Sequence, residues 1–423
     1  MTDLESKQKI LTRRSLIFTG ALSLPFLALI GRLYGLQIVA GQKYKRLSEA
    51  NRIAVRLTLP KRGVITDKEG RILAKNFKAF RLSIVPERAK DVSAVFENVS
   101  TLIDLPAKTR QQALQKIAKN PKFMAVPVKD FLSFSEVARL QVNLPDLPGV
   151  EVQELQSRSY PKKNFASHVI GFMGPVAKHH LQKSNDPLLR QPDFRIGRQG
   201  AEAHFDKQLR GKAGTDHVEV NARGREVRVL SQVQPQSGDD VSLTLVSPIQ
   251  DAAEKALQQH RGCVSLMDVH SGHVLAMASS PDFDPNSFVY GHGNKAWADF
   301  KQEKSNPLMN RCCQGRYPPA SIFKIVVALA ALEEELVTPE TEIDCTGKIY
   351  FGDRYFHCWK KQGHGAVNMH HAIAESCDVY FYELGRRLGI DKIKAYAHKL
   401  GLGEKTGIFC RNKRALFQIT PGK

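Results

Sequence analysis

A serine and a lysine three residues apart open a strongly apolar stretch, and such a pair could carry nucleophilic chemistry. Ser321 and Lys324 stand in the segment YPPASIFK, and the residues that follow predict a helix from Ser321 to Glu335. The spacing places both side chains on one helix face. A lysine in apolar surroundings can accept a serine proton, and N–H groups at a helix N-terminus stabilise a developing oxyanion. Serine is also a common helix N-cap, so the pair by itself decides little.

A second hydroxyl and a carboxylate follow further along the chain. Ser376 and Asp378 fall within a helix that the apolar periodicity predicts from Met369 to Leu388. The Ser376 hydroxyl could relay a proton between Lys324 and a leaving group, and Asp378 could orient a lysine or a substrate amide. Taken alone, the two residues would be better explained as an ordinary polar patch on a helix.

Three cysteines and a histidine form a spacing that could hold a metal ion. Cys345, Cys358, His364 and Cys377 follow the pattern C-x12-C-x5-H-x12-C, and Cys377 lies between the two polar residues of the second motif. Three thiolates and one imidazole suit tetrahedral zinc, which would lock that motif against a loop. A disulfide between two of the thiols, or three free thiols, are the alternatives.

The other cysteines remain unassigned. The chain has seven cysteines, an odd number for a protein in an oxidising compartment. The adjacent residues Cys312 and Cys313 cannot easily pair with each other, and no role is predicted for them or for Cys263 and Cys410.

The N-terminal region predicts a membrane anchor. Residues 16–31 carry no charge, and a weakly apolar stretch continues to residue 39, which is long enough to cross a bilayer if Arg32 reaches the interface. Basic residues precede this stretch, so residues 1–15 are expected in the cytoplasm and the remainder outside. A cleaved signal peptide is the alternative, but no convincing small-x-small cleavage site is present. The pair Arg13 and Arg14 matches a twin-arginine signal only weakly.

The net charge narrows the possible partners. The chain has 62 Lys and Arg against 42 Asp and Glu, a formal charge of +20 in 423 residues. This excess fits anionic lipid or an acidic polymer, although most such charges simply form a solvated surface. The chain lacks zinc-finger, RNP and helix-turn-helix patterns, so nucleic acid is not expected as a partner.

The patterning beyond the anchor predicts an α+β protein. A β-hairpin is predicted over residues 61–74, helices over 91–145, and a mixed stretch with short strands over 148–230. Residues 235–240 (PQSGDD) form the best boundary between domains. A strand over 241–245, a helix over 249–259 and two strands over 262–267 and 273–278 follow. Strands first and helices later give a mixed α+β domain.

These motifs together resemble class B penicillin-binding proteins, and within them the penicillin-binding protein 2 branch of elongation-specific D,D-transpeptidases. The motifs S-x-x-K, S-D-N and K-T-G mark the wider group, and Ser376-Cys377-Asp378 stands at the place of the second. Further resembling segments are residues 62–67 (RGVITD), 158–161 (RSYP), 197–202 (GRQGAE), 209–211 (LRG), 219–221 (EVN), 268–276, 283–286 (FDPN) and 317–319 (YPP). The resemblance runs from about residue 12 to Ile408.

The resemblance implies an organisation of the chain. It implies a cytoplasmic tail (1–15), an inner-membrane anchor (16–39), a mostly β pedestal or dimerisation-like domain (40–235) and a partial transpeptidase domain of the serine β-lactamase-like fold (236–408). The bulk of the chain is then expected in the periplasm. Residues 409–423 form a tail that is unlike the family.

The resemblance also implies a chemistry and partners. Ser321 would attack a D-Ala carbonyl of a peptidoglycan stem peptide, with Lys324 as base and with Ser376 and Asp378 handling protons and substrate. β-Lactams would acylate the same serine. The resemblance further implies zinc at the four metal-ligand positions named above, no cofactor for the chemistry itself, and a SEDS-family glycosyltransferase bound to the pedestal.

The third motif of the family is missing. Lys405, Thr406 and Gly407 spell K-T-G, but they come soon after Asp378 in a loop-like stretch, so we interpret them as a chance match. Resemblance fades after residue 408, which predicts a frameshift or a premature stop. Two other functions are therefore weighed: a β-lactamase or β-lactam sensor, against which the long pedestal argues, and a non-catalytic pedestal that binds the elongation machinery.

Overall fold

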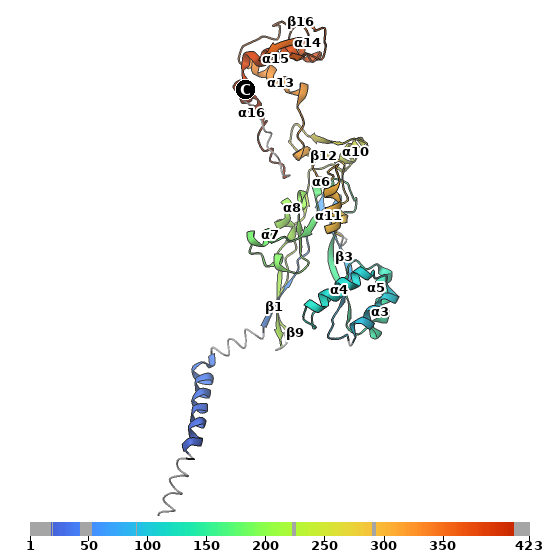
Figure 1. Cartoon of the computed structure of the whole chain (residues 1–423), viewed down its shortest axis with the longest axis vertical. Helices are drawn as coiled ribbons and strands as arrows, with labels where there is room; N and C mark the ends of the chain where they lie inside the picture. Colours follow the sequence, from blue (N-terminus) through green and yellow to red (C-terminus); the bar gives the residue numbers. More distant parts are fainter. Residues whose placement is uncertain are drawn as a thin grey trace, which may run out of the picture.

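The computed structural model describes residues 18, 20–42, 53–89, 91–221, 226–289 and 293–409. The protein is elongated, with an apolar helix at one end, β-rich structure in the middle and a compact helical unit at the other end (Figure 1). The predictions for the cytoplasmic tail, for the first residues of the anchor and for residues 410–423 lie outside the described residues.

The apolar helix has the length and composition of a membrane span. It covers Gly20–Val39, with mean hydropathy 1.6, and ends in the π-helical turn η1 (Gly35–Val39). None of its apolar window is buried inside the protein. A free apolar helix near the N-terminus fits an anchor, although a signal sequence shares these properties.

Strand β3 organises the main sheet of the middle region, since it pairs with three other strands. It is antiparallel to β5 along most of its length, and apolar side chains that alternate along it, such as Leu82 and Ile84, are fully buried. The five-stranded sheet contains β2 (Ile65–Thr66), β3 (Ile72–Ile84), β4 (Val126–Lys129), β5 (Val150–Ser159) and β10 (Val241–Ser242). The predicted hairpin over residues 61–74 is confirmed as β2–β3.

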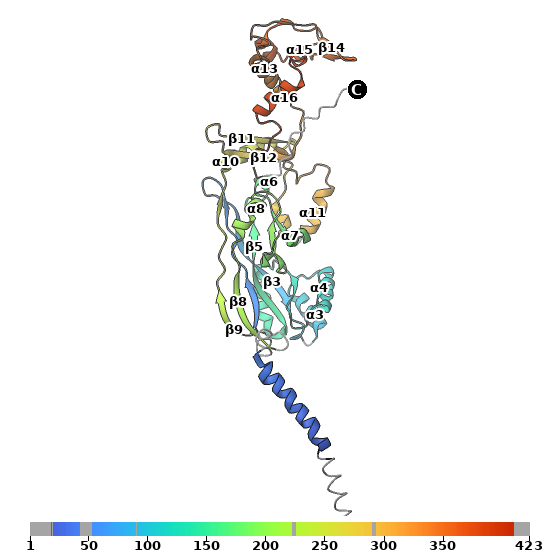
Figure 2. The same cartoon turned by 90° about the vertical axis from the view of Figure 1, so that its left-hand side faces the viewer.

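Two further sheets and a set of helices complete this region (Figure 2). The sheets are β1 (Ile53–Thr58), β8 (Gly214–Val220) and β9 (Glu226–Val233), and the pair β6 (Met173–Pro175) and β7 (Arg195–Gly197). The helices are α3 (Val92–Leu102), α4 (Ala107–Lys119), α5 (Phe134–Asn143), η2 (Leu144–Asp146), α6 (Ser167–Ile170), α7 (Lys178–Lys183), η3 (Pro187–Arg190), α8 (Gly200–His204) and α9 (Asp206–Arg210). Helices α3 and α5 begin at the side-chain caps Asp91 and Ser133.

A buried network of charges joins distant segments of the middle region. Arg158 donates to Glu202 at 2.6 Å and to the Gly63 carbonyl at 2.7 Å. Arg62 forms ion pairs with Glu202 at 2.7 Å and with Asp206 at 2.9 Å. Glu202 is fully buried, so the two guanidinium groups compensate its charge where water cannot.

A small α/β layer follows the middle region. Helix α10 (Ser247–Leu257) packs on the two-stranded sheet of β11 (Gly262–Met267) and β12 (Val274–Ser280), with buried contacts through Ala253, Leu257, Ala276 and Ala278. These elements confirm the helix and the two strands predicted from the sequence. The predicted strand over 241–245 shortens to β10. η4 (Pro285–Phe288), α11 (Gly293–Gln302) and α12 (Arg311–Gln314) complete this part.

The helical unit has its own core. Its elements are η5 (Ala320–Phe323), α13 (Lys324–Glu333), α14 (Met369–Ala374), α15 (Asp378–Leu388), α16 (Ile390–Lys399) and the strand pairs β13 (Ile343–Cys345) with β16 (Gly365–Val367) and β14 (Lys348–Phe351) with β15 (Arg354–His357). Buried side chains of α13 and α15, such as Ala330, Tyr380 and Leu384, meet in one cluster.

Two predicted helices are corrected. Ser321 does not cap a regular helix, because it lies in the 3-10 turn η5, and α13 begins only at Lys324. The single helix predicted over 369–388 is two helices, α14 and α15. The break falls at Ser376, whose φ of 53° is left-handed and cannot continue a right-handed helix.

Candidate active site

Ser321 is exposed at the start of the helical unit. Residues 318–319, both proline, lead into η5, and Ala320 adopts a left-handed φ of 49° directly before the serine. A non-glycine residue in that region costs energy that the surrounding structure must offset. The turn thereby presents the Ser321 hydroxyl to solvent.

The four predicted polar residues meet at this point. The Ser321 and Ser376 Oγ atoms lie 2.6 Å apart. Lys324 Nζ donates to Ser376 Oγ at 3.1 Å, to the Ser376 carbonyl at 2.8 Å and to Asp378 Oδ1 at 2.7 Å. These hydrogen bonds form a path from the Ser321 hydroxyl through Ser376 to the Lys324 amine. Three oxygen acceptors therefore surround the Lys324 amine.

The break between α14 and α15 positions Ser376 and Asp378. The left-handed Ser376 turns the chain so that its hydroxyl points back to Ser321, while Asp378 opens α15. Placed inside a continuous helix, as the sequence predicted, these side chains would point away from each other by about 200°, since helical residues advance about 100° each. The turn thus brings both to Lys324.

Trp359 holds this turn from the other side, and the sequence did not identify it. Its backbone N–H donates to Asp378 Oδ2 at 3.1 Å, and its indole Nε1–H donates to the Glu375 carbonyl at 3.0 Å. Its ring also lies edge-on to His364, with centroids 5.6 Å apart. The only signal in the sequence was its place next to Cys358.

The predicted metal ligands form one cluster beneath the turn. The ligand atoms of Cys345, Cys358, His364 and Cys377 all lie within 4.8 Å of one another. His364 Nδ1 lies 3.6 Å from the Sγ atoms of both Cys345 and Cys358. Tetrahedral zinc with bonds of about 2.3 Å to sulfur and about 2.0 Å to nitrogen would separate such atoms by about 3.6 Å. The arrangement fits a bound metal ion.

The metal-ligand cluster is hydrogen-bonded directly to the catalytic turn. Cys358 Sγ accepts the Asp378 backbone N–H at 3.4 Å. Burial raises the pKa of the Cys358 thiol, but backbone N–H groups, that of Asp378 foremost, outweigh it and leave the pKa below its usual value. Because of this hydrogen bond, a movement of the Cys358 side chain would also displace Asp378.

The remaining described cysteines lie near β11 and β12. Cys263 and Cys312 are free thiols, and Cys312 lies 3.2 Å from the Ala278 carbonyl. Burial, and then the neighbouring Cys263, raise the pKa of Cys312 to about 12, so it stays a protonated, unreactive thiol. Cys410 lies outside the described residues.

The K-T-G triplet is not on a strand. Residues 405–407 follow α16 in an irregular segment. This placement agrees with their interpretation as a chance match.

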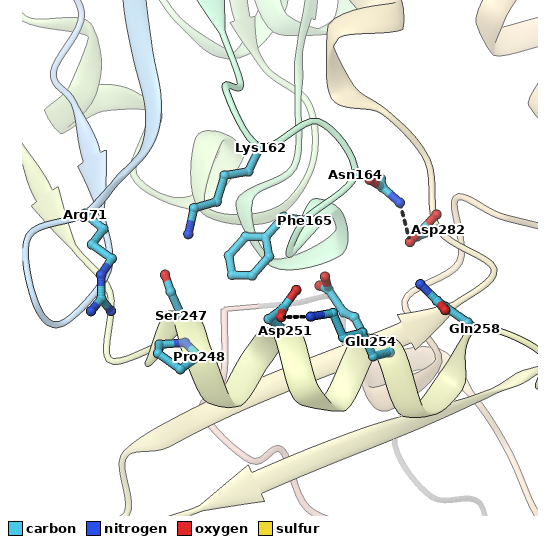
Figure 3. A pocket seen from close by; sticks show the side chains of 11 residues that line it. Arg71, Lys162, Asn164, Phe165, Ser247, Pro248, Asp251, Glu254, Gln258 and Asp282 are labelled. Atoms are coloured by element: carbon cyan, nitrogen blue, oxygen red, sulfur yellow. Dashed lines mark hydrogen bonds and ion pairs between the residues drawn. The ribbon is translucent and has the colours of Figure 1, made fainter.

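A well-defined cavity lies elsewhere, at the junction of the middle region and α10 (Figure 3). Its volume is about 660 Å³, and α10 forms its floor beneath the loop that carries Lys162 and Asn164. Asn164 donates to Asp282 at 2.9 Å. Neither Ser321 nor the three polar residues around it line this cavity, so the candidate chemistry does not belong to it.

Two family models match the chain. The penicillin-binding protein dimerisation domain matches residues 57–243, and the penicillin-binding protein transpeptidase domain matches residues 262–415. The first match covers most of the middle region, and the second covers the helical unit with all four polar residues.

Curated relatives match nearly the whole chain. The peptidoglycan D,D-transpeptidase MrdA of Escherichia coli K12 is 35% identical over 98% of this chain and 66% of its own length. MrdA of Acinetobacter baumannii is 32% identical over 96% of this chain and 61% of its own length. The chain thus spans just under two thirds of the length of these relatives.

Solved structures agree with the sequence matches. Penicillin-binding protein 2 of Helicobacter pylori is 30% identical, with a TM-score of 0.67 over 84% of this chain and 67% of that chain. In its complex with MreC the TM-score is 0.73 at 29% identity, over 86% of this chain and 68% of that chain. With both domain models in order along the sequence, the chain belongs to the penicillin-binding protein 2 branch of the class B penicillin-binding proteins.

Proposed function

We propose that the chain acts as a serine-type peptidoglycan D,D-transpeptidase of cell elongation and rod-shape maintenance. The observation that carries this function is the hydrogen-bonded path from Ser321 through Ser376 to Lys324. A nucleophile, a relay hydroxyl and an amine in this order are what acyl transfer through a covalent intermediate requires.

In the first half-reaction, Ser321 Oγ attacks the penultimate D-Ala carbonyl of a stem peptide. The Lys324 amine takes the serine proton through the Ser376 hydroxyl. The bond to the terminal D-Ala then breaks, and the proton returns to its leaving nitrogen. An acyl-enzyme on Ser321 remains.

In the second half-reaction, an amine from a neighbouring stem peptide attacks the acyl-enzyme. Its proton follows the same path to Lys324 and back to Ser321, which is thereby regenerated. Asp378 orients Lys324 through their 2.7 Å ion pair. β-Lactams present a similar carbonyl and acylate the same serine.

Labelling with a fluorescent penicillin tests this function. Membranes that carry the chain should show a labelled band near 47.3 kDa, and the Ser321→Ala variant should show none. If an immunoblot detects the wild-type protein but no label appears, the chain does not perform this chemistry. Loss of the label within minutes would instead indicate a β-lactamase.

Trp359 should act on this reaction by holding the catalytic turn. Trp359→Phe keeps the ring but removes the indole donor to Glu375, so Ser321 acylation should slow about three- to tenfold, as expected for one hydrogen bond. Trp297→Phe replaces the other tryptophan of the chain and should leave the rate unchanged. If Ser321 is acylated equally fast in both variants, the indole N–H of Trp359 does not help to position the catalytic turn.

The ion that Cys345, Cys358, His364 and Cys377 would hold is zinc. Its role is structural: the residues would fix the loop before Trp359 against the turn before α15, and the chemistry itself requires no cofactor. Elemental analysis of the purified protein should find one zinc ion per chain, and Cys358→Ser should lose it together with most Ser321 acylation. Protein that labels fully but contains almost no zinc would contradict this assignment.

The apolar helix would anchor the chain in the inner membrane, with residues 1–15 in the cytoplasm and the bulk of the chain in the periplasm. Residues 40–235 would form the pedestal and residues 236–408 the catalytic part. A pedestal partner from the SEDS family of glycosyltransferases is supported by a related chain, 29% identical with a TM-score of 0.64, in a peptidoglycan synthase complex that couples polymerisation and crosslinking. The complex of penicillin-binding protein 2 with MreC adds a second class of partner.

A further inference from the structure

The hairpin β14–β15 has one face packed on the helical unit and one face open. Ile349 packs against the core of the unit, and its cross-strand partner Phe356 lies edge-on to Tyr382, with centroids 5.8 Å apart. Neighbouring residues point the opposite way, because strand side chains alternate between faces. The hairpin is therefore held by one face alone, and it extends to the side of the unit near the β14 label in Figure 2.

The open face carries two aromatic rings and two basic groups. Tyr350 pairs with Tyr355 across the strands and Lys348 pairs with His357, and we call these four residues the aromatic face. The tyrosines are 59% and 54% exposed, with centroids 5.0 Å apart, and Lys348 Nζ lies 4.6 Å above the Tyr355 ring. Large rings left exposed together on one face are typical of a binding surface.

The charge of this segment selects the kind of partner. Residues 348–361 contain two arginine or lysine residues in the hairpin, Lys348 and Arg354, and then Lys360 and Lys361, against the single acid Asp353. Aromatic rings stack on the apolar C–H faces of sugar rings, and the cations attract carboxylates. A polymer of sugars that bears acidic peptides presents both features.

The aromatic face is linked to the catalytic turn at its base. The Cys358 N–H donates to the Gly347 carbonyl at 2.9 Å and closes the hairpin, while Cys358 Sγ accepts the Asp378 N–H. The four-residue strands extend about 13 Å from this point. A long substrate whose peptide is at Ser321 can thus continue along the hairpin.

We propose that the aromatic face binds the glycan strand of peptidoglycan and guides its stem peptides toward Ser321. This inference rests on the proposed function, since it names a subsite for the same substrate. The tyrosine rings supply stacking, and Lys348, on the same face, supplies attraction for the carboxylates of the stem peptides.

Co-sedimentation of the purified, detergent-solubilised chain with isolated peptidoglycan sacculi tests the proposal. The double variant Tyr350→Ala/Tyr355→Ala should bind sacculi at least about tenfold more weakly, since it removes two stacking rings. Tyr350→Phe/Tyr355→Phe keeps the rings and should bind like the wild type. Phe351→Ala is the matched control, because Phe351 is equally exposed on the other face of the same hairpin.

Penicillin labelling of Ser321 in the same variants separates this proposal from the proposed function. The double alanine variant should label within about twofold of the wild type, which also shows that it is folded. Unchanged sacculus binding by that variant overturns the proposal, whatever other partner the face has. An equal loss in Phe351→Ala also overturns it, because the effect would then not belong to the aromatic face. If no variant labels but the tyrosines still govern sacculus binding, only the proposed catalysis fails.

Discussion

Lys324→Ala should lower the rate of Ser321 acylation by penicillin about 10³-fold, the range expected for loss of a general base. Lys324 is the group at the end of the path that begins at the Ser321 hydroxyl, and its side chain is only 13% exposed. Without it, the serine proton has no acceptor. Stopped-flow or quenched-flow labelling with a fluorescent penicillin gives the rate constant directly.

Lys324→Arg distinguishes a base from a mere positive charge. Arginine keeps the ion pair with Asp378 but does not lose its proton, so it should be nearly as slow as the alanine variant. Lys392→Ala, which removes an exposed lysine paired with Glu334 in the same unit, is the control and should be unaffected. An arginine variant that acylates at a rate close to the wild type would mean that Lys324 only orients Ser376.

Glu202→Ala should destabilise the middle region by about 3–5 kcal/mol, because it leaves Arg62 and Arg158 buried without their shared counter-charge. The measurement is the free energy of unfolding of the detergent-solubilised chain in urea, followed by circular dichroism. Glu154→Ala removes the partner of Lys78 from an exposed ion pair and should change that free energy by less than about 1 kcal/mol.

Comparison of the two glutamate variants separates the effect of burying an ion pair from the effect of losing one charge. Both remove one carboxylate from an ion pair, and they differ in whether water can replace the lost partner. Similar values for the two variants would show that the Arg62–Glu202–Arg158 network is hydrated and contributes no more than a surface pair. Arg158 already has one buried Nη2 atom without a hydrogen-bond partner among the described residues, so a further loss there should be costly.

Local patterning predicted much of the fold. The predicted ends of helix α10 and of strands β11 and β12 lie within about two residues of the observed ends. Each of these elements buries one face, so its apolar residues recur with the period of a helix or of a strand. The β2–β3 hairpin followed from a turn between apolar runs. The antiparallel pairing of β3 with β5 could not be predicted, because the two strands lie far apart in sequence and no local pattern encodes their contact.

The residues of the candidate site were predictable, but their geometry was not. Motif spacing identified Ser321, Lys324, Ser376 and Asp378, and the structure brings all four together. The apolar period across residues 369–388 hid the break at Ser376, since periodicity continues through a single left-handed residue. Trp359 was missed because its role depends on donors aimed at Asp378 and Glu375, contacts that only the folded chain creates.

The sequence Ser376-Cys377-Asp378 places one buried thiol between two polar residues of the candidate site. For inhibitor design, this means that the site can be disabled without competing for Ser321. A soft electrophile that takes Cys358 from the metal-ligand cluster would displace Asp378, because Cys358 Sγ accepts the Asp378 backbone N–H. Because Cys358 is buried, such a compound would act slowly, at the rate at which the loop before Trp359 opens.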